Sequence, residues 1–176
     1  MKIGLCGTMS VGKTTLVKAL KETKEFKDYN FAIERSKYLN DLGIPLNTDS
    51  TLKGQTLFLA ERCAELMHDN IITDRTIIDV IAFTKSAKSI HRTESEEFES
   101  FASQFLREYD YIFYISPENI PIEDNGVREI DEHYRDLIDF SITHLIKRYS
   151  FMMDNVESIK GTTEERIQQI LRIISS

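Results

Sequence analysis

The stretch that decides the fold runs from Gly7 to Thr14 and reads GTMSVGKT. It matches the phosphate-binding pattern GxxxxGK[ST] at every fixed position. The apolar run from Lys2 to Cys6 predicts a buried strand before it, and the spacing of apolar residues from Thr14 to Leu20 predicts a helix after it. A glycine-rich turn that opens a helix points backbone N–H groups at phosphate oxygens. We therefore expect a nucleotide-binding loop at this position.

Each residue type in the loop suggests a separate task. Lys13 is expected to reach the β- and γ-phosphates of ATP and to take part in catalysis, while the Thr14 hydroxyl binds Mg²⁺. Thr15 is expected to contact the α-phosphate. A glycine-rich turn with an incidental lysine is the alternative, and the flanking strand and helix disfavour it. The residues expected to bind ATP are Gly7, Ser10, Val11, Gly12, Lys13, Thr14 and Thr15.

Short apolar runs alternate with helical periodicity along the rest of the chain. Strands are predicted at 29–33, 70–73 and 111–115, and a fifth strand is predicted within 151–159. Helices are predicted at 51–68, from 77, around 98–105, over 134–145 and after the capping box of Thr162 and Glu165. This alternation is typical of an α/β domain with a mostly parallel sheet covered on both faces. We interpret residues 1–176 as one domain with a flexible loop at about 85–97.

The charge balance bears on partners. Acidic residues outnumber basic ones by 29 to 22, which gives a net charge of −7. Proteins that bind a long phosphate backbone normally present a basic face, so a small phosphorylated ligand is favoured over nucleic acid. No apolar run is long enough for a membrane span, and the first residues lack the pattern of a signal peptide. With Cys6 and Cys63 as its only cysteines, the chain is expected to be cytoplasmic.

Further motifs follow the loop in a fixed order. FAIER at 31–35 ends the second predicted strand, LFLAER at 57–62 lies in a predicted helix, and DRT at 74–76 follows the third strand. YDYIFYI at 109–115 precedes IEDNGVR at 122–128. Over nearly the whole chain these motifs resemble the small-molecule P-loop kinases, most closely the ribosylnicotinamide kinase type, with thymidylate kinase as the next relative.

The resemblance implies an architecture and a set of cofactors. The expected fold is a P-loop NTPase three-layer sandwich, whose five-stranded parallel sheet has the order 2-3-1-4-5 and carries helices on both faces. The expected cofactors are ATP and Mg²⁺. A lid is expected at about 117–132.

Asp74 and Arg75 follow a predicted strand that would end beside the phosphate-binding loop. A carboxylate there can hold Mg²⁺ directly or through water, which makes Asp74 a candidate metal ligand and catalytic residue. Its alternative role is to cap the helix that begins near Ile77. Arg75 can form paired hydrogen bonds with a phosphate of the acceptor, or else belong to a surface ion pair.

The second strand and the helix after it supply candidates for substrate binding. Glu34 is a candidate base for an acceptor hydroxyl, or a hydrogen-bond partner for a sugar hydroxyl. Its alternative is an exposed residue at the end of a strand. Arg35, the next residue in the motif, is also a candidate for substrate binding. By resemblance to thymidylate kinase, Phe58 and Arg62 would stack on and read a base. The alternative is an amphipathic helix that buries phenylalanine, with Leu57, Phe58, Ala60, Cys63, Ala64 and Met67 mostly on one side.

Two arginines are candidates for closing over the phosphates. Arg128 follows Gly126 in the expected lid, where a cation would stabilise charge on the transferred group. Arg135 lies seven residues further on and is a candidate for substrate binding. The alternative for both is a set of surface ion pairs with Glu129, Asp131 and Glu132.

These observations favour ATP- and Mg²⁺-dependent transfer of the γ-phosphoryl group to a nucleoside or nucleoside monophosphate. Arg75 favours a monophosphate, such as a deoxynucleotide, whereas Glu34 and the lid pattern favour a nucleoside such as ribosylnicotinamide. The alternatives are an ATPase or polynucleotide kinase acting on nucleic acid, or a nucleotide-dependent switch. Guanine-specific switches carry Asn-Lys-x-Asp after the fourth strand, and residues 115–118 read ISPE. The sequence does not decide whether the protein forms a homodimer.

Overall fold

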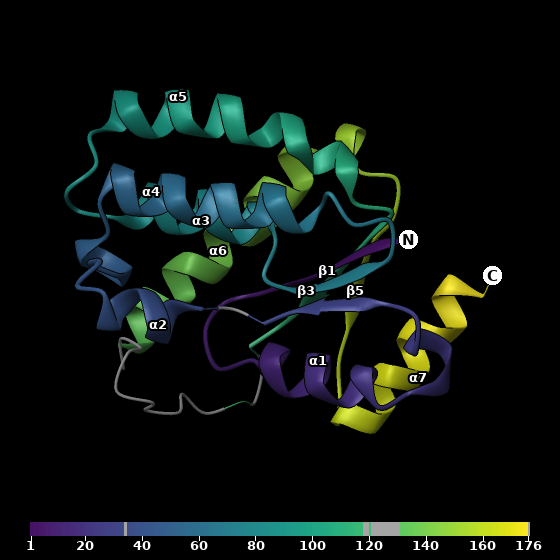
Figure 1. Ribbon diagram of the computed structural model, residues 1–176. Coiled ribbons are helices and arrows are strands. Elements are labelled where there is room, and N and C mark those ends of the chain that lie inside the picture. The colour runs from purple at the N-terminus through teal and green to yellow at the C-terminus, as the bar shows by residue number, and fades with distance from the viewer. Residues whose placement is uncertain (34, 118–119, 121–130, 176) are drawn as a thin grey trace.

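A computed structural model of the chain describes residues 1–33, 35–117, 120 and 131–175. It contains a parallel sheet of five strands in the order β2-β3-β1-β4-β5 (Figure 1). The strands are β1 (Lys2–Cys6), β2 (Asn30–Ala32), β3 (Ile71–Asp74), β4 (Tyr111–Ile115) and β5 (Val156–Ile159). The expected architecture and strand order are therefore confirmed.

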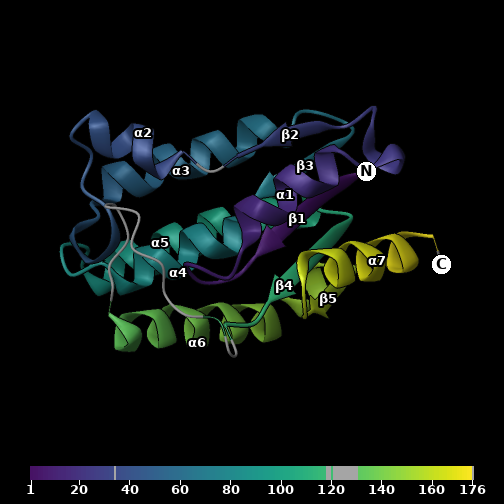
Figure 2. The same ribbon diagram turned by 90° about the horizontal axis from the view of Figure 1, so that it is seen from below.

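Helices cover the sheet on both faces. Helices α1 (Lys13–Lys21) and α7 (Thr163–Ile174) lie on one face, the near side in Figure 2. Helices α3 (Leu52–Glu65), α4 (Ile77–Ser86) and α6 (Glu132–Arg148) lie on the other, with α5 (Arg92–Ala102) outside α4 (Figure 1). The remaining elements are α2 (Ser36–Asp41) and the 3₁₀ turns Lys24–Phe26, Asn47–Asp49, Ser103–Glu108 and Ser150–Met152. No helix among the described residues has the length and apolar character needed to cross a membrane.

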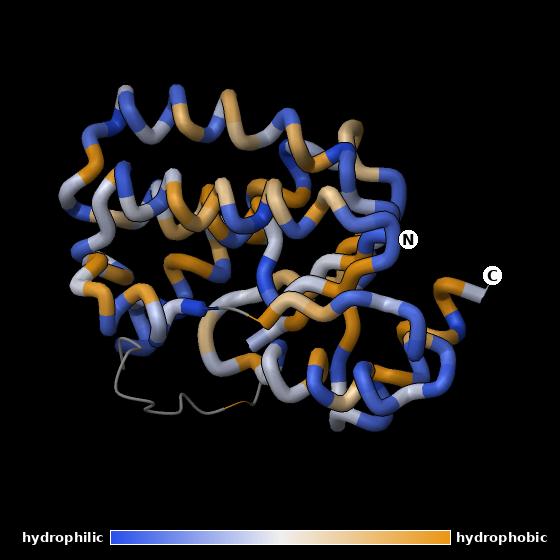
Figure 3. Tube along the Cα trace, viewed as in Figure 1, coloured by the Kyte–Doolittle hydropathy of each residue, from blue (hydrophilic) through white to orange (hydrophobic). Residues whose placement is uncertain are grey.

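The core has two parts, one on each side of the sheet, because side chains alternate along each strand. On β4, Phe113 and Ile115 face the core that α1 and α7 close, while Ile112 faces the core under α4 and α6. Helix α4 has apolar side chains all round and is buried along nearly its whole length. Figure 3 shows the hydrophobic residues gathered along the strands and the inner helices.

The segment at 85–97 corrects a prediction. Helix α4 continues to Ser86 and α5 begins at Arg92, so most of the expected loop is helical. The N–H of His91 donates to the Glu94 carboxylate at 2.9 Å, which satisfies a free donor at the start of α5. The sequence of this segment suggests a loop because α5 is an outer helix with few buried positions and therefore few apolar residues at helical spacing. Its buried residues are Ser95, Phe98, Glu99 and Ala102.

One further expectation is corrected, and another is confirmed. Helix α3 buries Gly54, Gln55, Leu59 and Arg62, whereas Leu57 is exposed and Met67 lies beyond the end of the helix and is 83% exposed. The expected fifth strand is present at Val156–Ile159, after Phe151, which lies in a 3₁₀ turn and is exposed. In α3 tertiary packing overrides the local distribution of apolar residues.

The central strand β1 passes very close to Thr76, which caps α4, and to Tyr109, two residues before β4. A Cβ added at Gly4 would lie 2.4 Å from the Thr76 methyl group and 2.9 Å from the Tyr109 ring. Both neighbours are buried, so they have little room to move.

We predict that Gly4→Ala lowers the free energy of unfolding by about 1–3 kcal/mol, because the added methyl group overpacks this contact. Adding Thr76→Ser removes the nearer methyl group while keeping the hydroxyl, and should recover part of the loss. Denaturant unfolding of the two variants and of T76S alone measures the effect. The loss caused by G4A is measured in the wild-type background and again in the T76S background. Equal losses of unfolding free energy in the two backgrounds would contradict the predicted clash with the Thr76 methyl group.

Candidate active site

The phosphate-binding loop joins the end of β1 to the start of α1. Gly12 caps α1 with φ 86°, a backbone conformation that a residue with a Cβ rarely adopts. Arg166 on α7 supports the loop, because its Nη1 donates to the Val11 carbonyl at 2.8 Å. Helix α7 therefore helps to fix the shape of the loop. Arg166 was not predicted from the sequence.

Lys13 lies inside this loop and is buried. Its Nζ donates to the carbonyl oxygens of Gly7 at 2.5 Å and Thr8 at 2.7 Å. Burial lowers the pKa of Lys13, and the positive charge of Arg75 lowers it further, while Asp79 and Asp74 raise it. The loop thus holds a cation at the place where the pattern predicts that phosphates bind.

The two predicted metal ligands are in contact. Strand β3 pairs with β1 so that Asp74 lies beside Leu5, just before the loop. The Thr14 hydroxyl donates to the buried Asp74 carboxylate. A hydroxyl and a carboxylate are oxygen ligands of the kind that Mg²⁺ takes, together with nucleotide phosphates, so the pair fits the implied metal. Thr76, not Asp74, caps α4, which rules out the alternative role for Asp74.

Asp79 links this loop to α4 and was not predicted. Its buried carboxylate accepts hydrogen bonds from the Gly7 N–H at 3.1 Å, the Thr76 N–H at 2.7 Å and the Thr76 hydroxyl at 2.8 Å. Thr76 and Asp79 have the three-residue spacing of a capping box, which was a readable signal. The carboxylate therefore fixes the first residue of the phosphate-binding loop to the start of α4.

Arg75 lies between two hollows. It has φ 84°, and its guanidinium carbon lies 4.7 Å from the centre of the Phe83 ring. The first hollow follows the phosphate-binding loop, and the second lies between α2, α3 and α4; Arg75 lines both. The first is lined by residues 9–15, Asp74, Arg75, Ile120, residues 161–163 and Arg166.

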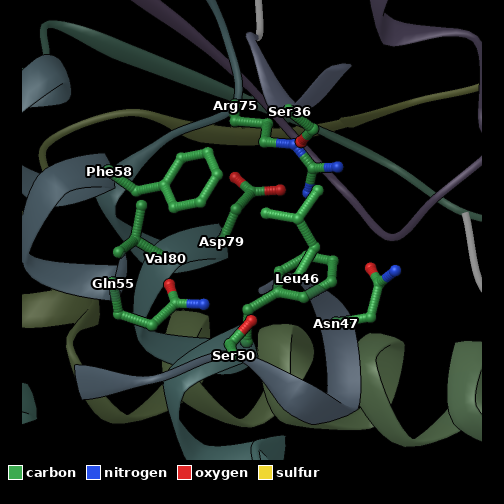
Figure 4. A pocket seen from close by; sticks show the side chains of 10 residues that line it. Ser36, Leu46, Asn47, Ser50, Gln55, Phe58, Arg75, Asp79 and Val80 are labelled. Carbon is green, nitrogen blue, oxygen red and sulfur yellow. The ribbon is translucent and has the colours of Figure 1, made fainter. Parts of the chain in front are cut away.

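The second hollow, of about 360 Å³ including space open to solvent, is the one in Figure 4. Phe58 and Gln55, one turn apart on α3, face it together with Asp79 and Arg75 (Figure 4). Phe58 was predicted at this site, whereas Gln55 was missed. The complete lining is Ser36, Leu46, Asn47, Ser50, Gln55, Phe58, Arg75, Asp79, Val80 and Phe83.

Three arginines predicted to bind substrate contact other parts of the protein. Arg35 lies over the Tyr38 ring at 4.3 Å and pairs with Glu61 at 3.4 Å. Arg135 donates to the carbonyls of Ile120 at 2.6 Å and Pro117 at 3.1 Å. Neither of these arginines, nor Arg62, lines the two hollows.

Arg62 is buried and donates to the carbonyl of Asp74 at 2.9 Å. Two other predicted residues, Glu34 and Arg128, lie outside the described part of the chain, as does most of the expected lid.

A family model described as "AAA domain" matches residues 2–166. The chain belongs to this family. This is a P-loop family, in agreement with the loop described above, and the match covers nearly the whole sequence. Among curated proteins, no relative is found.

Solved structures with the same fold include nucleoside-kinase-type proteins. Deoxyadenosine kinase from M. mycoides with bound dCTP has a TM-score of 0.69, 18% identity and 99% coverage of both chains. NadR in complex with NR has a TM-score of 0.75 and 16% identity, over 97% of this chain and 50% of NadR. YorR from Bacillus subtilis in complex with phosphorylated GDP has a TM-score of 0.57, 15% identity, and coverage of 99% and 96%. At these identities the likeness shows the P-loop kinase fold.

We predict that Asp79→Ala lowers the free energy of unfolding by about 3–5 kcal/mol, because it leaves three buried donors without their charged acceptor. The matched control is Asp28→Ala, which removes an exposed aspartate and should change stability by less than about 0.5 kcal/mol. Denaturant unfolding measures both. A D79A variant as stable as D28A would show that this carboxylate does not fix the loop to α4.

Proposed function

We propose that the protein is a phosphotransferase that moves the γ-phosphoryl group of Mg²⁺-bound ATP to a nucleoside or nucleoside monophosphate. The observation that carries the proposal is the position of Arg75, which lines both the hollow along the phosphate-binding loop and the hollow between α2, α3 and α4. Donor and acceptor sites that meet at one cation are what an in-line phosphoryl transfer requires.

The chemistry of the second hollow supports an acceptor with an aromatic base. The Phe58 ring offers a face for stacking, and the buried Gln55 amide offers both a donor and an acceptor to a base edge. The fold neighbours support the same class of acceptor, because they include a deoxyadenosine kinase and a protein in complex with NR.

The residues of the first hollow provide for the phosphates. Lys13 neutralises charge at the transferred group, and Arg75 gathers charge where the two hollows meet. Thr14 and Asp74 would hold the metal ion, which supplies charge neutralisation on the β- and γ-phosphates when it is bound. Asp79 and Arg166 hold the loop in place through Gly7 and Val11.

Two residues complete the proposal on the strength of the sequence. Glu34 would accept the proton of an acceptor hydroxyl, or bind a sugar hydroxyl if the acceptor is already a monophosphate. Arg128 would bring a second cation to the transferred group. Both roles remain proposals from the motif order in which these residues occur.

We predict that Lys13→Ala lowers the rate of phosphoryl transfer by at least about 10²–10³-fold, because a preorganised cation is lost from the phosphate site. The control Lys18→Ala removes an exposed lysine from the same helix and should keep the wild-type rate. Product formation by mass spectrometry measures the rates, and circular dichroism checks that K13A is folded. A folded K13A with wild-type turnover would remove Lys13 from the mechanism.

We predict that Arg75→Ala reduces kcat/KM for a monophosphate acceptor at least about tenfold more than for the matching nucleoside, because only the monophosphate offers a phosphate for paired hydrogen bonds. The measurement is ATP consumption with product identification across nucleosides, ribosylnicotinamide and monophosphates. Equal losses for both classes would show that Arg75 does not bind an acceptor phosphate. Hydrolysis of ATP that no small acceptor changes, but nucleic acid stimulates, would instead indicate a P-loop ATPase.

A further inference from the structure

Arg62 is a buried cation whose contacts reach the candidate active site from behind. Only 2% of its surface is exposed. Its Nη1 donates to the backbone carbonyl of Asp74 at 2.9 Å, and its Nη2 donates to the Glu65 carboxylate at 2.6 Å. Burying a guanidinium is costly unless it is paired and hydrogen-bonded. Glu65 supplies the pairing, and the carbonyl at the end of β3 accepts a hydrogen bond from the other terminal nitrogen.

The peptide between Asp74 and Arg75 is a strained point of the site. Arg75 has φ 84°, a left-handed backbone conformation that is strained for a residue with a side chain and persists only where the surroundings enforce it. The N–H of this peptide donates to the Leu5 carbonyl at 3.0 Å, and its C=O accepts from Arg62. Strand β1 and helix α3 therefore hold the same peptide from its two polar ends.

This peptide sets the direction of two functional side chains. The Asp74 carboxylate before it contacts the Thr14 hydroxyl, and the Arg75 guanidinium after it lies over Phe83 between the two hollows. A change of φ at Arg75 to a negative value would break the hydrogen bonds at the two polar ends of this peptide, and it would change the direction in which the chain and the Arg75 side chain leave β3.

We propose that Arg62 is a positioning residue that fixes the Asp74–Arg75 peptide. In this position the Asp74 carboxylate faces Thr14, and the Arg75 guanidinium faces the second hollow. The catalytic consequence rests on the proposed phosphoryl transfer, whereas the fixation of the peptide does not. Arg62 touches neither hollow, so it acts through Asp74 and Arg75.

A matched pair of variants separates positioning from general support of the fold. Arg62→Lys and Glu65→Gln both disturb the ion pair between these residues. Only R62K changes the donor to the Asp74 carbonyl, because a lysine ammonium lacks the planar fork that reaches two acceptors at once. A purely structural role of Arg62 predicts similar behaviour in the two variants.

The first measurement uses the protein without nucleotide or metal. Amide hydrogen exchange followed by NMR should show the Arg75 N–H exchanging at least about tenfold faster in R62K than in the wild type, because the strained peptide is released. E65Q should stay within about twofold of the wild type at this amide. The control is the Leu16 amide, which donates a hydrogen bond to the Gly12 carbonyl at the start of α1. Faster exchange at this amide would report a general loosening of the fold.

The second measurement is calorimetric binding of a non-hydrolysable ATP analogue with and without Mg²⁺. Loss of a partner that orients a metal ligand typically costs 10–100-fold, so R62K should weaken binding with Mg²⁺ by about that factor. Without Mg²⁺, R62K should bind the analogue within about twofold of the wild-type affinity. In R62K the fold decrease in kcat should exceed the fold increase in KM for the acceptor. E65Q should show none of these changes. If R62K does not fold, Arg62→Gln is measured in its place.

Equal effects of R62K and E65Q on Arg75 exchange and on the Mg²⁺ dependence would overturn the proposal, as would wild-type values in R62K. If the wild type transfers phosphate to no small acceptor, the proposed function fails. Amide exchange and metal-dependent nucleotide binding still decide the role of Arg62 in that case.

Discussion

Parallel pairing of β1 with β3 is the constraint on which the site depends. It sets Asp74 beside Leu5, so that the carboxylate at the end of one strand meets the loop that leaves the other. Because parallel strands end at the same edge of a sheet, no further chain reversal is needed to bring Thr14 and Asp74 together. The helices then hold this edge in shape, α7 through Arg166, α4 through Asp79 and α3 through Arg62.

The parts of the structure that could be predicted from the sequence are those with local signals. The loop from Gly7 to Thr14 is contiguous, and its glycine at position 12 answers a backbone requirement that is visible in the structure as φ 86°. The five strands and the capping box of α7 are likewise short-range patterns. The strand order followed from the resemblance to P-loop kinases, because periodicity alone does not determine which strands are neighbours.

The parts that could not be predicted depend on partners far away in the sequence. On α3, the distribution of apolar residues favours the side with Leu57 and Ala64, yet the helix buries Gln55 and Arg62. Arg62 is tolerated inside because a carbonyl of β3 and Glu65 accept its hydrogen bonds. Sequence reasoning that assigns charged residues to the surface therefore reads α3 in the wrong rotation, and misses Gln55 at the second hollow.

The buried charges at this edge explain how the fold prepares the site for a polyanion. Lys13, Asp74, Asp79 and Arg62 are all buried, and each has hydrogen-bond partners in the protein. The cost of removing them from water is met during folding, so their dipoles and charges need little rearrangement when phosphates arrive. The Lys13 ammonium has three N–H groups, and its hydrogen bonds within the described residues go to the carbonyls of Gly7 and Thr8. The third N–H can therefore bind a phosphate oxygen without breaking the contacts that fix the loop.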